Sequence, residues 1–382
     1  MANKGALSGI TILDISRLLP GPYCSMILAD HGARVIAVEN SRFKADAPFL
    51  TCLYRNKEHV SLDLKTPEGK EIFFKLVERA DVVLEGFRPG ATDRLGVDYD
   101  RVKRVNPRII YCSITGYGQT GPYRDRVGHD ANYLGVAGVL DLIGEKDKPP
   151  SIPGVQIADI AGGSLNGAIG ILLALFARER TGVGQYIDIS MTDAMAGFMQ
   201  IPLLSQQVMG QTFERSDNIL SHRYAFYTTY ETCDNQYLTL GALEYRFWET
   251  LCHTLGVPEF APLQYDEPRR IEIIATLREK FKQKTLAQWE KALSDLDICW
   301  GPVNTLPQVL EDKHLAHRKM VVDFEDQNGK KIPTLGVAVK LSETPGSLRS
   351  APTDFGKDTR NVLTELGYSP RQIDDFFEAN IV

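Results

Sequence analysis

The chain has 382 residues, of which 43% are hydrophobic, 9% aromatic and 24% charged. This is the composition of a globular protein with a sizeable core, and the length corresponds to about two or three domains. With 43 lysines and arginines against 49 aspartates and glutamates, the formal charge is −6, which argues against a basic protein that binds nucleic-acid phosphates.

The six cysteines are scattered, without the paired spacing of a zinc site or the density of a disulfide framework. We therefore expect reduced thiols and no bound metal. The N-terminal residues lack the apolar core and small-residue cleavage site of a signal peptide, and no run of about 18 apolar residues follows. The expectation is a cytoplasmic protein that binds neither membranes nor nucleic acids.

Strand-like and helix-like segments alternate over the first half of the chain. The predicted strands are residues 9–16, 33–40, 60–64, 81–87, 108–115 and 186–191. The predicted helices are residues 23–32, 69–80, 157–180 and 192–209. Strands that alternate with helices predict a mostly parallel sheet with helices on both faces. Residues 157–180 are apolar nearly all round, which predicts a buried helix.

The second half of the chain differs in composition, with aromatic and threonine-rich segments that are followed by predicted helices. Two strands around residues 233–236 predict one hairpin, and Asn328-Gly329 marks the turn of another. Further helices are predicted at 244–256, 268–283 and 285–295, and two more in the C-terminal tail. We expect a large α/β domain of residues 1–200 and 319–382, a linker at 201–219 and a smaller α+β domain at 220–318.

Three familiar motifs are present only in imperfect form. The segment GYGQTG (116–121) fits the dinucleotide-binding glycine pattern, but Pro122 follows where a helix should begin, so a glycine-rich turn is the better interpretation. GGSLNG (162–167) lacks the closing glycine of a hydrolase elbow and follows no predicted strand. His314 and His317 lack the acidic partner of a metalloprotease helix, and no metal is expected there.

A loop at residues 40–65 is rich in positive charge. Its basic residues are Arg42, Lys44, Arg55, Lys57 and Lys65. From the residues alone, a solvated face is the favoured interpretation.

Ionisable residues at three positions have unusual neighbours. His129 and Asp130 lie between a glycine and an apolar stretch, Asp159 precedes a glycine-rich apolar helix, and Glu244 stands where a strand gives way to a helix. Either of the latter two carboxylates, taken singly, is explained by helix N-capping, and His129 by a structural role. Catalysis would require the side chains of His129, Asp159 and Glu244 to lie close together in the folded protein.

Taken together, these segments resemble the class III coenzyme A transferase (CaiB/BaiF) family and, within it, the α-methylacyl-CoA racemases. The similarity covers nearly the whole chain and includes GITILDISRLLPGPYC, ADVVLEGFRPG, SITGYGQTGP, GHDANY, ADIAGG and GALE, in that order. The resemblance implies a Rossmann-like large domain, a small domain, and two chains interlocked as a homodimer. It places the active site between the large domain of one chain and the small domain of the other.

The resemblance also implies roles for individual residues. His129, Asp159 and Glu244 match the functional residues of the racemases, whereas transferases of the family usually lack the histidine. The implied reaction is 1,1-proton transfer at the thioester α-carbon: His129 serves one face, Asp159 the other, and Glu244 orients His129. We expect backbone N–H groups at the start of the Asp159 helix to stabilise the enolate.

Coenzyme A enters as part of the acyl-CoA substrate, and no tightly bound cofactor is expected. By matching motifs, the implied CoA contacts are Asn40, Arg42, Leu62, Asp63, Leu64, Lys65, Arg88, Gly128, Asp130, Asn132 and Tyr133. Asn40 stands where racemases commonly have arginine, and Arg42 is the nearby substitute. On this interpretation the basic loop binds CoA.

Three hypotheses follow. The leading one is a 2-methylacyl-CoA racemase. The alternative is a CoA transferase acting between carboxylic acids, with Asp159 as the covalent nucleophile that forms an aspartyl-CoA thioester. A silent CoA-binding subunit is disfavoured, because such a subunit has no need of Asp159.

Overall fold

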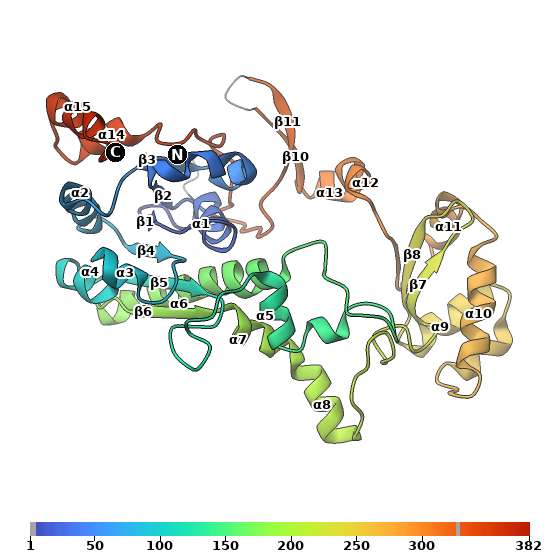
Figure 1. The fold of residues 1–382 in the computed structure, drawn as a ribbon. Coiled ribbons are helices and arrows are strands. Elements are labelled where there is room, and N and C mark those ends of the chain that lie inside the picture. The colour runs from blue at the N-terminus through green and yellow to red at the C-terminus, as the bar shows by residue number, and fades with distance from the viewer. Residues whose placement is uncertain (1–4, 326–328) are drawn as a thin grey trace. The chain divides into compact units, whose positions relative to one another are not determined.

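The structure is a computed structural model that describes residues 5–325 and 329–382. The chain divides into two compact units (Figure 1). The first unit contains the chain up to Val139, Pro153–Met199 and Lys313–Val382, and the second contains Leu140–Ile152 and Gln200–Asp312. The segment predicted as a linker, 201–219, lies in the second unit, as does the excursion Leu140–Ile152, which the sequence pattern did not separate from the large domain.

A six-stranded, fully parallel sheet forms the centre of the first unit, with the order β3-β2-β1-β4-β5-β6. Its strands are β1 (Thr11–Asp14), β2 (Arg34–Glu39), β3 (Lys57–Ser61), β4 (Val82–Glu85), β5 (Ile110–Thr115) and β6 (Tyr186–Ser190). Each predicted strand of this half is present, although β3 begins and ends about three residues earlier than expected. The order reverses between β1 and β4, as in Rossmann folds, where ligands bind beyond the carboxyl ends of the strands.

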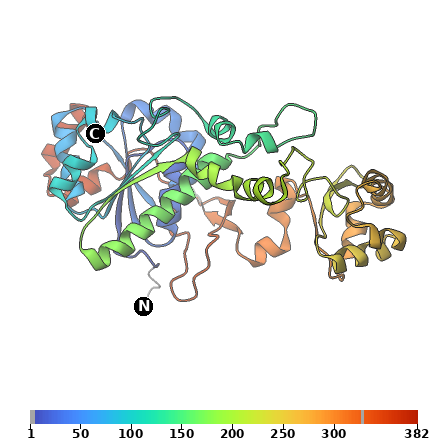
Figure 2. The same cartoon turned by 90° about the horizontal axis from the view of Figure 1, so that it is seen from below.

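Helices cover both faces of the sheet, as predicted. One face of the sheet packs against four helices, two of which come from the C-terminal tail. The hydrophobic core on this face includes Leu13, Ile36, Val60, Val83 and Tyr111 from the strands. The helices on this face are α2 (Pro67–Val77), α4 (Tyr99–Val105), α14 (Thr359–Glu365) and α15 (Pro370–Glu378). The opposite face carries α1 (Pro20–Asp30) and α6 (Asn166–Thr181), and Figure 2 shows the green helix α6 running along the sheet.

The segment predicted as one buried helix at 157–180 differs from that expectation. It begins as a π-helix, η3 (Ala158–Leu165), and continues as α6. Side chains on one side of α6 are exposed in this single chain, including Ile169, Leu173 and Phe176 at 54–64%. By length and composition, Ala158–Thr181 is the one helix among the described residues that is apolar enough to cross a membrane, but core helices of soluble proteins have the same properties.

The second unit is a small α+β assembly. Strands β7 (Tyr227–Glu231), β8 (Tyr237–Gly241) and β9 (Trp300–Pro302) form an antiparallel sheet. Its helices are α8 (Gln200–Met209), α9 (Tyr245–Thr254), α10 (Arg270–Phe281), α11 (Leu286–Leu293) and α12 (Leu306–Glu311). Trp248, Phe281 and Trp289 anchor its core. The predicted hairpin at 233–236 is present, with Asn235 in the left-handed conformation at φ 56°.

The remaining elements connect or border these layers. They are η1 (Ser41–Tyr54), α3 (Ala91–Leu95), α5 (Asp130–Val136), η2 (Leu140–Leu142), α7 (Met191–Ala196), η4 (Gly197–Met199), η5 (Pro258–Leu263), α13 (Lys313–His317), β10 (Val321–Glu325) and β11 (Lys331–Leu335). Strands β10 and β11 form the second predicted hairpin. Gly329 of its turn has a φ of 76°, whereas Asn328 lies outside the described residues.

Candidate functional site

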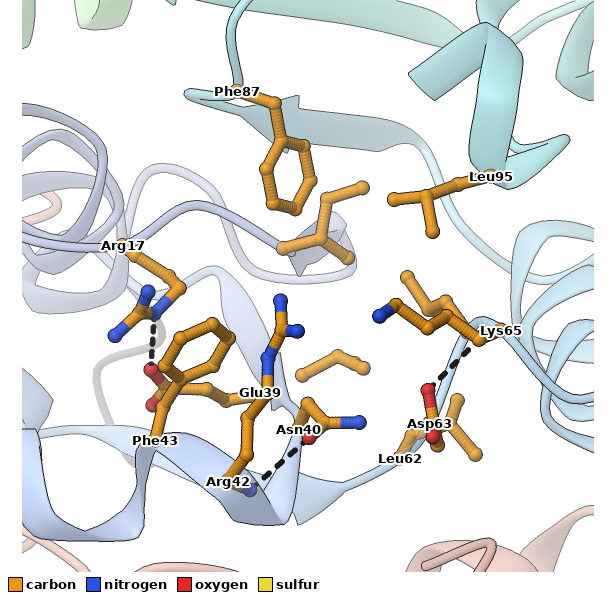
Figure 3. Close-up of a pocket in the computed structure, with 13 residues that line it drawn as sticks. Arg17, Glu39, Asn40, Arg42, Phe43, Leu62, Asp63, Lys65, Phe87 and Leu95 are labelled. Carbon is orange, nitrogen blue, oxygen red and sulfur yellow. Dashed lines mark hydrogen bonds and ion pairs between the residues drawn. The ribbon is translucent and has the colours of Figure 1, made fainter. Parts of the chain in front are cut away.

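A pocket opens at the carboxyl ends of strands β1 to β4, beside the point where the strand order reverses (Figure 3). Its lining residues are Ile15, Arg17, Val38, Glu39, Asn40, Arg42, Phe43, Leu62, Asp63, Leu64, Lys65, Phe87 and Leu95. They follow four different strands, because the carboxyl ends of parallel strands meet at one edge. The location is that of the nucleotide site in Rossmann-like folds.

Positive charge and apolar surface meet in this pocket. Arg17 donates from Nε to the Glu39 carboxylate at 2.8 Å, and its guanidinium lies 3.1 Å from the centre of the Phe43 ring. Buried His59 approaches the other oxygen of Glu39 at 3.5 Å. Arg42 and Lys65 extend into the pocket from opposite sides in Figure 3. Such a site suits a ligand with an aromatic group and anionic groups.

Six of the residues predicted to contact CoA line this pocket. They are Asn40, Arg42, Leu62, Asp63, Leu64 and Lys65. Asn40 caps η1, since its Oδ1 accepts from the Arg42 N–H at 3.0 Å, so its side chain orders the loop that carries Arg42. Arg88 is next to the lining residue Phe87 but is not part of the lining.

Other basic residues of the 40–65 loop have a different role from the one predicted. Arg55 is buried and pairs with Asp30 at 2.6 Å, and Lys57 is buried 3.6 Å from Asp14. These two cations are therefore neither solvated nor available to CoA. Sequence spacing could not separate them from Arg42 and Lys65, because the partner carboxylates lie 25 or more residues away.

Sequence reasoning missed several lining residues, among them Arg17, Glu39, Phe43 and Phe87. A signal existed for Glu39, since an acidic residue at the end of the second strand is typical of nucleotide-binding Rossmann folds. The others are apolar or basic residues in loops, and only the folded sheet edge brings them together.

The second group of predicted residues lies at the carboxyl end of β5 and on the π-helix. Asp159 is the second residue of η3 and is half-buried. Glycines let this helix approach its neighbours closely: a Cβ on Gly163 would lie 2.9 Å from the Pro20 side chain of α1. Ser164 donates from its hydroxyl to the Pro20 carbonyl at 2.7 Å. A π-helix is rare and is frequently found at functional sites.

The short helix α5 presents His129 and Asp130 beside the π-helix. His129 is the exposed N-cap residue, and its N–H donates to Asn132 Oδ1 at 2.9 Å. Tyr133 is buried and donates from its hydroxyl to the Gly128 carbonyl. A Cβ on Gly116, directly after β5, would lie 2.3 Å from the Tyr133 ring. Gly128, Asn132 and Tyr133 therefore shape the turn that holds His129.

Asp159 has an altered acidity. Burial, reinforced by the negative charge of Asp130, raises the pKa of Asp159 to about 6, although positive charge on His129 acts in the opposite direction. His129 and Asp159 are therefore close enough to interact electrostatically, which brings together two of the three groups that the sequence analysis required to meet. A carboxyl group that titrates near neutral pH is suited to general acid–base catalysis.

Two backbone N–H groups at the start of the Asp159 helix, where the enolate is expected to bind, have partners within the protein. The Asp159 N–H donates to Asp130 Oδ1 at 2.9 Å, and the Ile160 N–H donates to the Gln156 carbonyl at 3.1 Å. These two donors are already used within the protein. The N-capping explanation of Asp159 is wrong, because Ile157 occupies the N-cap position of the π-helix.

Glu244 belongs to the second unit. It is exposed and occupies the N-cap position of α9, but its side chain forms no capping hydrogen bond. Its backbone carbonyl accepts instead from the N–H groups of Phe247 and Trp248. The carboxylate is thus not required to begin the helix.

The weak motifs have structural explanations. In GYGQTG, Gly118 and Gly121 have φ values of 84° and 85°, and the Gln119 N–H donates to the Asp188 carboxylate at 3.0 Å. The segment is a turn anchored by a carboxylate. Within residues 5–325 and 329–382, no group of three or more His, Cys, Asp or Glu side chains is arranged to hold a metal ion.

Comparison with known proteins agrees with this geometry. The family model described as CoA-transferase family III matches residues 7–359. The chain belongs to CoA-transferase family III. It is 36% identical to alpha-methylacyl-CoA racemase from Homo sapiens over 385 residues, covering 99% of each chain. It is also 30% identical to succinyl-CoA:glutarate CoA-transferase from Homo sapiens, covering 100% of this chain and 91% of the relative.

A solved structure shares the fold of this family III protein. The crystal structure of a CAIB/BAIF family protein from Brucella suis matches with a TM-score of 0.83 and 31% sequence identity, over 95% of this chain and 100% of that one. The predicted family and the predicted α/β fold with a parallel sheet are therefore confirmed. Racemases and transferases are both among the relatives, so membership establishes an enzyme that acts on CoA thioesters and leaves the reaction to be argued from the site.

Proposed function

We propose that this protein is a 2-methylacyl-CoA racemase. The observation that carries the proposal is that His129 interacts electrostatically with a carboxyl group, Asp159, whose pKa of about 6 suits proton transfer. A group that removes and returns protons gains from a pKa near the working pH.

The reaction proceeds by 1,1-proton transfer. One of the two groups removes the α-proton of the thioester to give an enolate, and the other delivers a proton to the opposite face of the same carbon. The base that has accepted a proton is the acid for the reverse direction, so the same pair serves both enantiomers. General acid–base catalysis of this kind contributes about 10²–10⁴-fold.

The pocket at β1 to β4 binds the nucleotide part of the CoA thioester in this proposal. Arg42 and Lys65 provide cations for its phosphates, and Phe43 and Phe87 provide apolar surface. The pocket and α5 both border the carboxyl edge of the same sheet, so one extended substrate can reach both. Arg88, next to Phe87, adds a further cation at this edge.

Glu244 and the homodimer complete the proposed site. In an interlocked pair of chains, the small unit of the partner brings Glu244 to His129 and orients the imidazole. Pairing also provides a cover for the apolar side chains of α6 that are exposed in the single chain, including Leu173 and Phe176.

The alternative is a CoA transferase that moves CoA between carboxylic acids. Its specific support is the half-buried Asp159, a carboxylate that can attack the thioester carbonyl. The thiolate of CoA would leave as the acyl-aspartyl anhydride forms, and would then attack the aspartyl carbonyl, which releases the donor acid and leaves an aspartyl-CoA thioester. The acceptor carboxylate would attack this thioester and expel the thiolate, which would then attack the acceptor acyl carbonyl of the second anhydride and free the Asp159 carboxylate. His129 has no necessary part in that sequence.

The deciding experiment incubates the purified protein with a single enantiomer of a 2-methylacyl-CoA in D2O. No free carboxylic acid is added. Mass spectrometry follows α-deuterium incorporation, and chiral chromatography follows the formation of the other enantiomer. We expect deuterium incorporation and racemisation in the wild type, and at least a 100-fold loss of both in His129→Ala.

Two controls separate the reactions. His314→Ala removes a histidine on α13 outside the site and should leave the rate unchanged. In parallel, succinate and other acids are supplied as CoA acceptors. Transfer of CoA without α-deuterium incorporation, at equal rates in wild type and His129→Ala, contradicts the racemase and supports the transferase.

A further inference from the structure

The side chain of Asp130 is hydrogen-bonded to the backbone of the segment that carries Asp159. Its side chain is buried, with 9% exposure, and its Oδ1 accepts from the Asp159 N–H at 2.9 Å. This bond joins the first turn of α5 to the first turn of the π-helix, across 29 positions of sequence. The segments that carry His129 and Asp159 are thus joined through the Asp130 carboxylate.

The same carboxylate places negative charge beside Asp159. Burial is the main cause of the raised pKa of Asp159, and the negative charge of Asp130 is the second. His129 lowers the pKa of Asp159. Tyr133 of α5 also interacts with Asp159. Helices α1 and α7 and strands β5 and β6 pack against the π-helix as well. Their titratable residues are Tyr23, Cys24, Asp30, Tyr111, Cys112, Tyr186, Asp188 and Asp193.

We propose that Asp130 is a positioning residue for Asp159, which it holds through the backbone N–H while setting the local charge around the Asp159 carboxylate. The inference rests on the proposed function only in naming Asp159 as a reacting group. One oxygen of the Asp130 carboxylate is thereby used inside the protein, whereas the role of Asp130 as a CoA contact stays a prediction.

The two parts of this role are separated by two substitutions. Asp130→Asn keeps an oxygen that can accept from the Asp159 N–H but removes the charge. Asp130→Ala removes both. Asp193→Asn is the matched control, since Asp193 is an exposed carboxylate on α7, a neighbouring helix that also packs against the π-helix.

The charge is tested without any activity assay, through the pH dependence of thermal stability. Folded Asp159 has a pKa of about 6 against an ordinary value of 3.8, so its ionisation opposes folding. The free-energy cost that ionised Asp159 imposes on the folded state is fully present above about pH 6 and absent below about pH 4. Asp159→Asn should therefore raise the melting temperature at pH 7.5 more than at pH 4. We expect this pH-dependent gain to be smaller when Asp130→Asn is also present, and to persist in full with Asp193→Asn.

The hydrogen bond is tested by kinetics. We expect Asp130→Ala to lower kcat roughly 10- to 100-fold, because small misplacements of a reacting group are costly. The KM for the acyl-CoA should change less than threefold, and Asp130→Asn should recover most of kcat. The same kcat and KM are measured for whichever activity, racemase or transferase, the wild type shows.

Three results would overturn the inference. They are an undiminished pH-dependent gain in the Asp130→Asn background, a normal kcat in Asp130→Ala, and a KM increase that exceeds the loss of kcat, which would indicate a direct CoA contact. Failure of the proposed function is distinguished from these outcomes. If the wild type has neither activity, that function is refuted, while the melting temperatures still decide whether Asp130 acts on Asp159.

Discussion

Replacement of Lys57 by methionine should destabilise the first unit strongly, because it would leave a buried carboxylate without its cation. The Lys57 side chain is fully buried at the start of β3. Its ammonium donates to the Pro22 carbonyl at 2.8 Å and to the Ser25 hydroxyl at 2.7 Å, and lies 3.6 Å from Asp14 Oδ2. Asp14 is 2% exposed.

The magnitude follows from that burial. Removing one partner of a buried ion pair typically costs about 3–5 kcal/mol, since the other charge remains desolvated. Methionine has a similar length and adapts to irregular space, so lost packing adds little. Burial already lowers the pKa of Lys57, with Asp14 acting against that effect, so the ammonium is held in the core by this carboxylate. A loss of that size is a large part of the stability of an ordinary domain, about 5–15 kcal/mol.

The assay is urea unfolding at pH 7, followed by circular dichroism at one fixed protein concentration. Lys103→Met, on the exposed face of α4, is the matched control and should change the unfolding free energy by less than about 0.5 kcal/mol. Adding Asp14→Asn to Lys57→Met removes the unpaired charge and should recover part of the loss. The reasoning is refuted if Lys57→Met costs less than 1 kcal/mol, or if the double variant is no more stable than the single one.

Two further substitutions test the pocket and the π-helix. Lys65→Gln removes a cation that lines the nucleotide pocket, so the KM for acyl-CoA should rise roughly tenfold or more with kcat little changed. Steady-state kinetics measure this change, with Lys103→Gln as the control variant. An equal KM in both variants would contradict phosphate binding by Lys65. Gly163→Ala places a Cβ 2.9 Å from the Pro20 side chain and 3.2 Å from Ile114, so α1 and η3 must separate. We expect a stability loss of about 1–3 kcal/mol and a lower kcat, and unchanged values of both would show that the contact is not needed.

The architecture of the first unit could be predicted because its signals are local. Each strand of the parallel sheet is a short apolar run bounded by turn residues, and each crossover helix carries its own start signal, such as Thr66 before Pro67. The excursion at 140–152 could not be predicted, because its assignment to the second unit depends on contacts with residues more than 60 positions away, such as the bond from Arg215 to the Asp141 carbonyl.

The candidate site could be predicted only as a set of residues. His129 and Asp159 were identified from motif resemblance, and nothing in their spacing indicates that the Asp159 N–H is bound by Asp130. The π-helix has the same apolar pattern as an α-helix, so its extra residue per turn leaves no mark in the sequence. Lys57 and Lys65 illustrate the same limit: one cation is buried in the core and the other lines the pocket, although the two lie eight residues apart in one basic loop.

The turn between β1 and α1 connects the two halves of the site. Arg17 of this turn lines the pocket, and the next residue, Leu18, has a φ of 66°, a conformation that non-glycine residues adopt only when their surroundings impose it. Two residues further on, the Pro20 carbonyl accepts from Ser164 of the π-helix. Asp14 lies directly beneath the turn, where its carboxylate accepts from the Ser16 N–H at 3.0 Å.

The buried pair of Asp14 and Lys57 is therefore better explained by the groups that it holds in place than by its contribution to the free energy of unfolding. An apolar pair of equal volume would commonly be as stable or more so, because it avoids desolvating two charges. It would not hold the Ser16 N–H, the Ser25 hydroxyl and the Pro22 carbonyl at fixed positions around the turn. The ion pair thus holds the backbone of the turn that carries Arg17 of the pocket and Pro20, whose carbonyl accepts from Ser164 of the π-helix.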